Sequence, residues 1–295
     1  MKTMVTFKDY FLAYMRNSHK RNGNIYLEYF KSATLKTLTY ENITPNNMRK
    51  FQSHLLEHIS PSATNTYVGI LRTATKKYAL EYGLKYDVRL DDIKNVKCGK
   101  SQSTYLTEDE IKKFASYIPE NDYCYYVHRL FFICLMTGCR WSDAQEMTLS
   151  KVQGNKFSYV AQKTKSMSSG MYVGENVLQI LRDKRFTSMQ KKPCSRPTIG
   201  KYIKHICEKI GLTDEITLYQ AGEYKTKPKW EFITSHVGRR SAATNLYLRD
   251  PNALLNISRM LGHSSTSQTE RYIKCATEDT DRMRSYKDEF TLSGY

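Results

Sequence analysis

Tyr272 lies in the sequence TERYIK, close to the carboxyl end and shortly after the sequence LGHSST. A phenolic oxygen can attack an electrophile once it loses its proton, but the ordinary pKa of a tyrosine is about 10. A tyrosine that does chemistry therefore needs a partner able to accept that proton. The chain has 23 tyrosines, so the residue type alone does not separate a nucleophile from a surface aromatic residue.

His236 and Arg239 lie in SHVGRRSAATNLYL, and Ser235 is expected to cap a helix that carries both. Residues three apart share a helix face, and the amino end of a helix favours an anion. The pattern is typical of a phosphate site. A basic helix with a histidine that is satisfied by its neighbours is the other interpretation.

Arg140 and His263 each follow a glycine that is expected to end a helix. Arg140 lies in TGCRWSDA after Gly138, and His263 lies in MLGHSS after Gly262. An arginine directly after a buried helix is held by a rigid scaffold. It can equally compensate the negative carboxyl end of that helix.

Lys163 and Lys165 lie in QKTKSMSSGMYV, in or beside an expected β-turn. A lysine at the tip of a hairpin can reach a DNA groove and deliver a proton there. A solvated surface lysine is the alternative interpretation.

The elements that would position these residues fall into two parts. Residues 6–16, 24–38, a segment opened by Thr44-Pro45 and a segment from Ser62 to Gly83 show helical patterns. The last of these helices carries the basic side chains Arg72, Lys76 and Lys77 on its other face. We expect a small helical unit with a basic face.

Residues 94–104 are short, polar and rich in lysine, which predicts a linker. The second part opens with a capping box at Thr107–Glu110, and a mostly apolar helix follows over 122–137. Alternating residues predict a hairpin over 156–173 and another over 216–234, with residues 225–229 at its tip. The sequence after Ser235 is helical in short pieces, so the fold class is mainly α with a small β-sheet.

The composition favours a polyanion as the partner. The formal net charge is +17, which indicates nucleic acid first and an acidic membrane second. We find no apolar run of the roughly 20 residues that a membrane span needs, and the amino end is unlike a signal peptide. The seven cysteines form no C-x-x-C pair, so we expect a reducing cytoplasm, no disulfide framework and no zinc site. No carboxylate cluster suits Mg²⁺.

The five sequences TGCR, QKTK, HVGR, LGHSS and TERY occur in this order, and together they resemble the tyrosine recombinase, or phage integrase, family. The resemblance is detailed over residues 105–290 and only generic over the helical amino-terminal part. It implies a helical, SAM-like core-binding domain over 1–96, a linker over 97–104, and an α+β catalytic domain over 105–295 that ends in a tail.

The resemblance also implies a role for each of these residues. Tyr272 would attack a DNA phosphodiester and form a 3′-phosphotyrosyl link. The H-x-x-R and K-T patterns select Arg239 over Arg240 and Lys163 over Lys165. The implied catalytic residues are Arg140 and Arg239 as phosphate ligands, Lys163 as general acid and Tyr272 as nucleophile. His236 would accept the proton or donate a supporting hydrogen bond, and His263 would be a further donor to the phosphate or to the tyrosine. The expected DNA-binding residues are Arg72, Lys76, Lys77, Lys165 and Arg240.

The expected activity is site-specific recombination of double-stranded DNA, without a metal, ATP or any other cofactor. Four protomers would assemble on two paired duplexes, and the tail over 280–295 would pack on a neighbouring subunit or on its own domain. The expected location is the cytoplasm, at the nucleoid. The alternatives are a type IB topoisomerase-like relaxing enzyme and a catalytically silent architectural DNA-binding protein. A helical RNA-binding protein is a third alternative, but the sequence lacks RNP and KH patterns.

Overall fold

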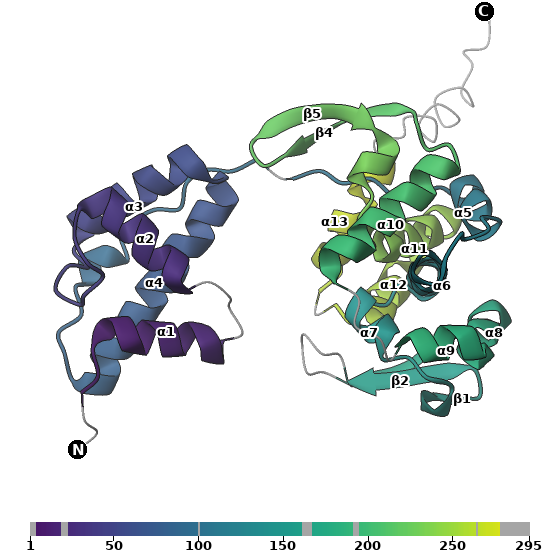
Figure 1. Ribbon diagram of the computed structural model, residues 1–295, viewed down its shortest axis with the longest axis horizontal. Coiled ribbons are helices and arrows are strands. Elements are labelled where there is room, and N and C mark those ends of the chain that lie inside the picture. The colour runs from purple at the N-terminus through teal and green to yellow at the C-terminus, as the bar shows by residue number, and fades with distance from the viewer. Residues whose placement is uncertain are drawn as a thin grey trace, which may run out of the picture. The chain divides into compact units, whose positions relative to one another are not determined.

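The computed structural model describes residues 4–18, 23–99, 101–160, 167–190, 195–263 and 265–277. The chain divides into two compact units, which are Met1–Ser101 with Tyr219–Tyr224, and Gln102–Leu218 with Lys225–Tyr295. Figure 1 labels the elements of both. No helix among the described residues is both long enough and apolar enough to cross a membrane.

The first unit is built from helices. Their bounds are α1 Phe7–Asn17, α2 Gly23–Thr34, α3 Pro45–His58, α4 Pro61–Tyr82 and the short 3₁₀ helix η1 Val88–Leu90. Its core contains many aromatic side chains, among them Phe11, Phe30 and Phe51, each with 0% of its surface exposed. The helical pattern of apolar residues therefore marks the buried faces correctly.

The ends of α3 and α4 follow from local chemistry. Thr44 caps α3 by accepting a hydrogen bond from the backbone of Asn47, and α4 ends at Gly83 in the left-handed conformation with φ 64°. The prediction that Ser62 caps α4 is wrong. Ser60 is the cap and Pro61 is the first helical residue, a position that suits proline because its N–H would have no helical partner.

The second unit carries the remaining helices. Their bounds are α5 Glu108–Ala115, α6 Asp122–Thr137, α7 Trp141–Gln145, α8 Glu175–Arg182, α9 Lys184–Gln190, α10 Arg196–Lys209, α11 Ser235–Arg249, α12 Leu254–Leu261 and α13 Thr266–Thr277. The 3₁₀ helices are η2 Leu149–Lys151, η3 Lys229–Phe232 and η4 Pro251–Ala253. The predicted capping box at the start of α5 is present in both directions between Thr107 and Glu110.

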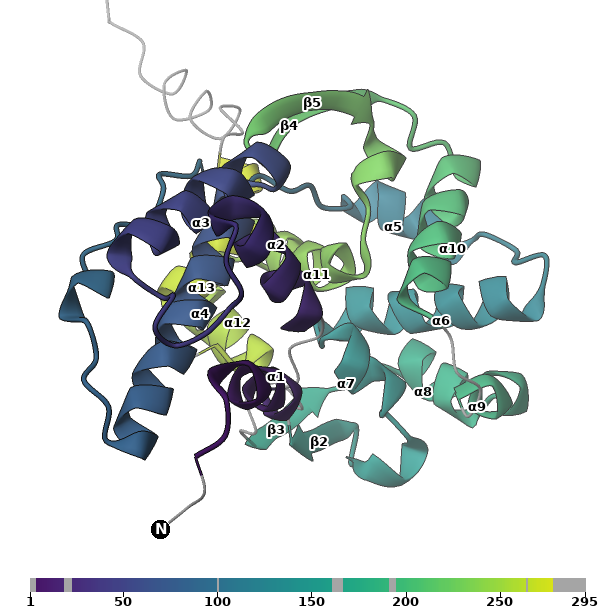
Figure 2. The same cartoon turned by 60° about the vertical axis from the view of Figure 1, so that its left-hand side comes forward.

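Helix α6 is the scaffold of the second unit. It contacts α7, α8, α9, α10 and α11, and Figures 1 and 2 show it beside α10 and α11. Gly238 lets α11 come close, because a Cβ atom there would lie 3.0 Å from Cys134 Cβ and 3.2 Å from the Phe131 ring. As predicted, Gly138 ends α6 in the left-handed conformation with φ 67°.

Among the described residues, two small antiparallel sheets complete the fold. The first has the order β1 Val152–Gln153, β2 Lys156–Val160 and β3 Met167–Tyr172, with Lys156 opposite Tyr172. The second pairs β4 Glu215–Gln220 with β5 Glu223–Pro228. The prediction of mainly helical structure with a small sheet is thus confirmed.

The tip of the second hairpin differs from the prediction. The turn consists of Ala221 and Gly222, both with positive φ (55° and 102°), and residues 225–228 belong to strand β5. Two positive-φ residues give the turn that matches the twist of a two-stranded ribbon, and glycine adopts this conformation without strain.

Candidate active site

The start of α11 brings His236 and Arg239 to one face, as the spacing predicts. The prediction that Ser235 caps this helix is wrong, because Ser235 is its first residue. Thr234 occupies the cap position, and its side chain makes no capping hydrogen bond. His236 remains exposed at this end, whereas Arg239 points into the protein and is only 1% exposed.

Arg239 is held by two helix ends and one histidine. Its Nη1 donates to the carbonyl of Gly138 at 2.9 Å, and its Nη2 donates to the carbonyl of Leu261 at 2.5 Å. Nη2 also lies 3.0 Å from His263 Nε2. Carbonyls at the carboxyl ends of helices lack helical partners and carry partial negative charge, so α6 and α12 stabilise the buried guanidinium.

His263 links Arg239 to α13. Because the guanidinium can only donate, Nε2 of His263 accepts, and a neutral ring then carries its hydrogen on Nδ1. That atom lies 2.9 Å from Thr269 Oγ1, and Thr269 is fully buried. Burial, together with the positive charges of Arg239 and Arg140 and the nearby His236, lowers the pKa of His263 to about 4. His263 is therefore neutral at pH 7.

Tyr272 lies at the centre of these groups. Its hydroxyl is 2.8 Å from His236 Nε2, within hydrogen-bond distance. Its ring stacks on the His263 ring, with centroids 5.3 Å apart and planes inclined by 22°. The Arg240 guanidinium lies 4.9 Å from the centroid of the Tyr272 ring. The hydroxyl thus lies beside a histidine nitrogen, and a guanidinium lies over the ring.

Arg140 enters the site from the turn between α6 and α7. Its Nη1 lies 3.7 Å from Asp143 Oδ2, and the side chains are 19% and 1% exposed. The buried carboxylate of Asp143 thus pairs with Arg140 and restrains its guanidinium. The effect of Arg140 on the pKa of His263 also places its charge near the other site residues.

Sequence reasoning missed the contacts that attach α13 to α11. Thr244 Oγ1 donates to the Tyr272 carbonyl at 3.1 Å, and Arg240 Nη1 donates to the carbonyls of Arg271 and Tyr272 at 2.9 and 3.4 Å. Arg240 and Thr244 are four residues apart and therefore share one face of α11, and this spacing is the available sequence signal for the contact with α13. The partner segment lies about thirty residues further on, and no periodicity indicates it.

Lys163 and Lys165 lie outside the described residues, between strands β2 and β3. The structure therefore brings together five of the six expected catalytic residues, which are Arg140, His236, Arg239, His263 and Tyr272.

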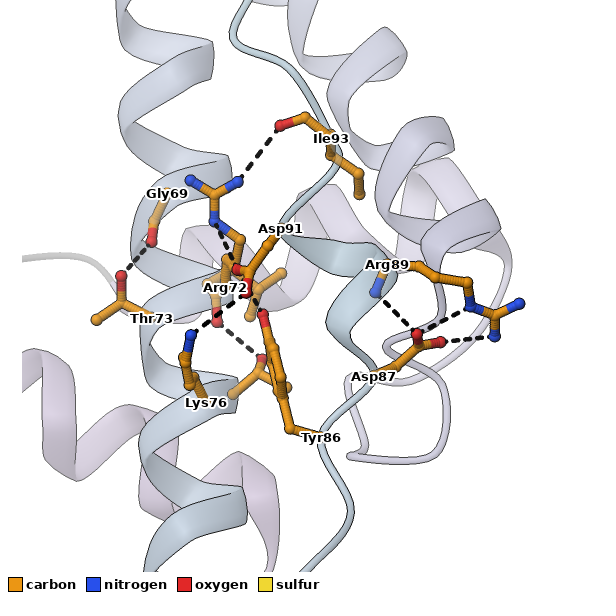
Figure 3. A network of polar contacts seen from close by, with 11 residues as sticks. Gly69, Arg72, Thr73, Lys76, Tyr86, Asp87, Arg89, Asp91 and Ile93 are labelled. Atoms are coloured by element: carbon orange, nitrogen blue, oxygen red, sulfur yellow. Dashed lines mark hydrogen bonds and ion pairs between the residues drawn. The ribbon is translucent and has the colours of Figure 1, made fainter.

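The expected DNA-binding residues of α4 have partners within the first unit, and Figure 3 shows those of Arg72 and Lys76. Arg72 donates to the Ile93 carbonyl at 3.3 Å and lies 3.9 Å from Asp91, whereas Lys76 Nζ lies 3.3 Å from Asp91. Lys77 Nζ lies 5.3 Å from the centroid of the Tyr14 ring. Asp91 thus offsets part of the positive charge on this face, and a DNA contact by these residues stays a prediction.

Comparison with known proteins identifies the family and the fold. The model of the phage integrase family matches residues 104–279, more than half of the chain. The chain therefore belongs to the phage integrase family, and so to the tyrosine recombinases, which are enzymes.

Individual relatives are distant. The integrase of Escherichia phage P2 is 23% identical over 223 residues, which cover 75% of this chain but only 57% of that protein. Tyrosine recombinase XerC of Treponema denticola is 22% identical over 283 residues and 90% of both chains. The chain thus spans little more than half of the first relative and most of the second.

Two crystal structures of lambda integrase share the fold. A dimer of its residues 75–356 bound to a COC′ core site has a TM-score of 0.64 and 17% identity, covering 91% of this chain and 95% of that chain. A tetramer bound to a Holliday junction has a TM-score of 0.60 and 16% identity, covering 92% and 78%.

Proposed function

We propose that this protein is a site-specific recombinase that cuts and rejoins DNA strands through a covalent link to Tyr272. The observation that carries the proposal is the hydrogen-bond distance of 2.8 Å between the Tyr272 hydroxyl and His236 Nε2, in a site that also holds Arg140 and Arg239. A nucleophile, a proton acceptor and two permanent cations are what phosphoryl transfer to a tyrosine requires.

The chemical step transfers one phosphoryl group. The Tyr272 oxygen bonds to phosphorus, its proton passes to His236, and the bond from phosphorus to the 5′ oxygen of deoxyribose breaks. That oxygen is strongly basic and takes a proton from Lys163. The phosphotyrosyl link keeps the energy of the broken phosphodiester, so a 5′-hydroxyl can reverse the step without ATP.

The two arginines stabilise the charge that develops on the non-bridging oxygens. Guanidinium groups are always charged and offer paired donors that fit phosphate geometry. Arg239 is fixed before DNA binds, because the carbonyls of Gly138 and Leu261 already hold it. We assign His263 to positioning Arg239, since both of its ring nitrogens have partners within the protein. The arginines supply the charge stabilisation that a metal ion would otherwise give, so the step runs without a metal.

The substrate is double-stranded DNA with a specific site. The net charge of +17 and the DNA bound by lambda integrase in its crystal structures support this assignment. Residues 1–96 would form the core-binding domain, 97–104 the linker, and Arg72, Lys76, Lys77, Lys165 and Arg240 would contact the backbone. The tetramer of lambda integrase on a Holliday junction supports assembly of four protomers on two paired sites, which would place the protein at the nucleoid.

A two-stage experiment tests the proposal. Covalent protein–DNA adducts are first isolated under denaturing conditions from cells that express the chain, and the attached DNA is sequenced to find the site. A duplex nicked beside the mapped cleavage point is then incubated with the purified protein, with EDTA and without ATP. Wild type is expected to form an adduct on a denaturing gel, and Tyr272→Phe to bind this duplex without forming one. An adduct with Tyr272→Phe, or none with wild type, would contradict the proposal.

A further inference from the structure

The carboxyl end of α3 presents three side chains that ligate metals. His54, Glu57 and His58 are spaced i, i+3 and i+4, so they share one face of the helix. One donor atom from each lies within 4.8 Å of the others. A tetrahedral ion with bonds of about 2.0–2.1 Å has ligand atoms about 3.4 Å apart, a spacing that side-chain rotations can reach from here.

His58 is held in the orientation and tautomer of a ligand. Its Nδ1 lies 2.8 Å from the carbonyl oxygen of His54. A carbonyl only accepts, so Nδ1 carries the hydrogen and Nε2 keeps a free lone pair. Histidines that ligate metals commonly donate their other N–H to an oxygen in this way.

A neighbouring helix restricts both imidazole rings. Tyr29 of α2 packs at 6.0 Å from the His54 ring and 6.1 Å from the His58 ring, measured between centroids, and the two imidazoles are 4.3 Å apart. Rings that packing already restrains lose less conformational freedom when they bind an ion. Glu57 completes the group, with its carboxylate 3.8 Å from His54 Nδ1.

The surroundings also favour a cation. The site lies in the last turn of α3, where the helix dipole is negative. The side chain of Glu57 is 72% exposed and that of His54 is 22% exposed, so an ion and its water ligands can reach the group from solvent. Two nitrogens and one oxygen suit Zn²⁺, Ni²⁺, Co²⁺ or Cu²⁺ better than Mg²⁺ or Ca²⁺, which prefer oxygen ligands alone.

We propose that His54, Glu57 and His58 bind one divalent transition-metal ion, with water in the remaining positions. The ion would ligate both histidines through imidazole nitrogen and Glu57 through a carboxylate oxygen. The site lies in the first unit, outside the residues assigned to phosphoryl transfer. Its consequence is structural, because an ion that bridges the last turn of α3 stabilises the folded first unit by mass action.

Isothermal titration of the full-length chain with Zn²⁺, after EDTA treatment and buffer exchange, tests the proposal. We expect a 1:1 binding event that weakens at least 10-fold in His54→Ala and His58→Ala, and less in Glu57→Gln. His205→Ala is the matched control, because His205 is a partly exposed histidine that also pairs with a glutamate, Glu120, but lies outside this group. Binding unchanged in both histidine variants, whose fold is checked by circular dichroism, would overturn the proposal.

Cobalt substitution separates this site from the cysteines. Co²⁺ bound to nitrogen and oxygen gives only weak visible bands, whereas a thiolate ligand adds an intense charge-transfer band in the near ultraviolet. We expect wild type to show the weak bands alone, and His54→Ala with His58→Ala to lose them. A thiolate band in wild type, persisting in this double variant, would place the ion at a cysteine and contradict the assignment.

Discussion

The two units place their charged side chains in different ways. On α4 of the first unit, Arg72 and Lys76 lie near the surface and share the carboxylate of Asp91. In the second unit, Arg239 is 1% exposed and is held by backbone carbonyls at two helix ends. A surface charge is screened by water and salt, whereas a buried and fixed charge acts strongly on a reacting phosphate. The second unit therefore holds a fixed, buried charge of the kind that the proposed chemistry requires, whereas the charges on α4 are exposed to solvent and partly offset by Asp91.

The largest effect is expected from Arg140→Ala. The substitution removes a charged contact to the transition state, so cleavage of the nicked duplex should slow by about 10³-fold or more while the duplex still binds. Single-turnover rates on a denaturing gel measure the cleavage, and a mobility shift measures the binding. Arg140→Lys is the matched control, because it keeps the charge but loses the paired donors. Its cleavage rate should lie between those of wild type and Arg140→Ala. A cleavage rate for Arg140→Ala within a few-fold of wild type would contradict the role assigned to this residue.

Thr269→Val tests whether a buried hydroxyl acts through His263. Valine has a similar shape but cannot bond to Nδ1, so His263 and Arg239 should lose their fixed orientation. Losing one such hydrogen bond costs about 1 kcal/mol, which corresponds to a roughly 5- to 10-fold slower cleavage. Thr269→Ser should keep most of the activity. The positioning role is wrong if valine and serine give the same cleavage rate and the same thermal stability.

The stability of the second unit should depend on pH through His128. This buried residue of α6 has Nε2 2.6 Å from the Phe114 carbonyl, and burial lowers its pKa to about 4. The unfolded chain, with an ordinary histidine pKa, binds the proton first, so stability is fully present above about pH 6.5 and falls as the pH drops toward 4. The loss can reach about 3 kcal/mol. Urea unfolding at pH 7, 6 and 5 should show the decrease.

NMR of the His128 imidazole supplies the site-specific check on that pH dependence. The ring should stay neutral in the native protein down to about pH 5. A native titration near pH 6.5 would show that the buried ring does not resist protonation.

The smallest effect is expected from Lys76→Ala with Lys77→Ala in the first unit. If α4 faces DNA, the double variant should weaken binding of the mapped duplex only a few-fold and reduce the dependence of affinity on salt. Fluorescence anisotropy at several salt concentrations measures this. Because Asp91 already pairs with Lys76, an unchanged salt slope would remove these residues from the DNA-binding surface and sharpen the contrast between the units.

The sequence predicts most helix ends because their signals are local. Thr44-Pro45, the capping box at Thr107 and Gly138 each act within a few residues, and the structure has all three. Ser60 and Ser62 flank Pro61 and have equal capping propensity, so only the preference of proline for the first helical position separates them. Similarly, Gly222 is a local signal for the turn at Ala221-Gly222, but the prediction placed the tip of the hairpin at the lysine-containing residues 225–229.

The sequence predicts which residues form the candidate site, but it predicts only part of how their side chains contact one another. Motif order selected His236 and Tyr272, whose hydrogen-bond distance depends on how α13 packs against α11. The contacts of Arg240 depend on the same packing, which joins segments about thirty residues apart without any shared periodicity. Thr269 contacts His263 across six residues, through the turn that leads into α13. These residues could be identified only in three dimensions.

The central claim is that Tyr272 forms the covalent link to the cleaved DNA strand. Trapped adduct from the nicked duplex can be digested with nuclease and trypsin, and the nucleotide-bearing peptide sequenced by mass spectrometry. We predict the phosphate on the oxygen of Tyr272, linked to a 3′ end of the DNA. A nucleotide on any other residue, or a link to a 5′ end, would contradict this account.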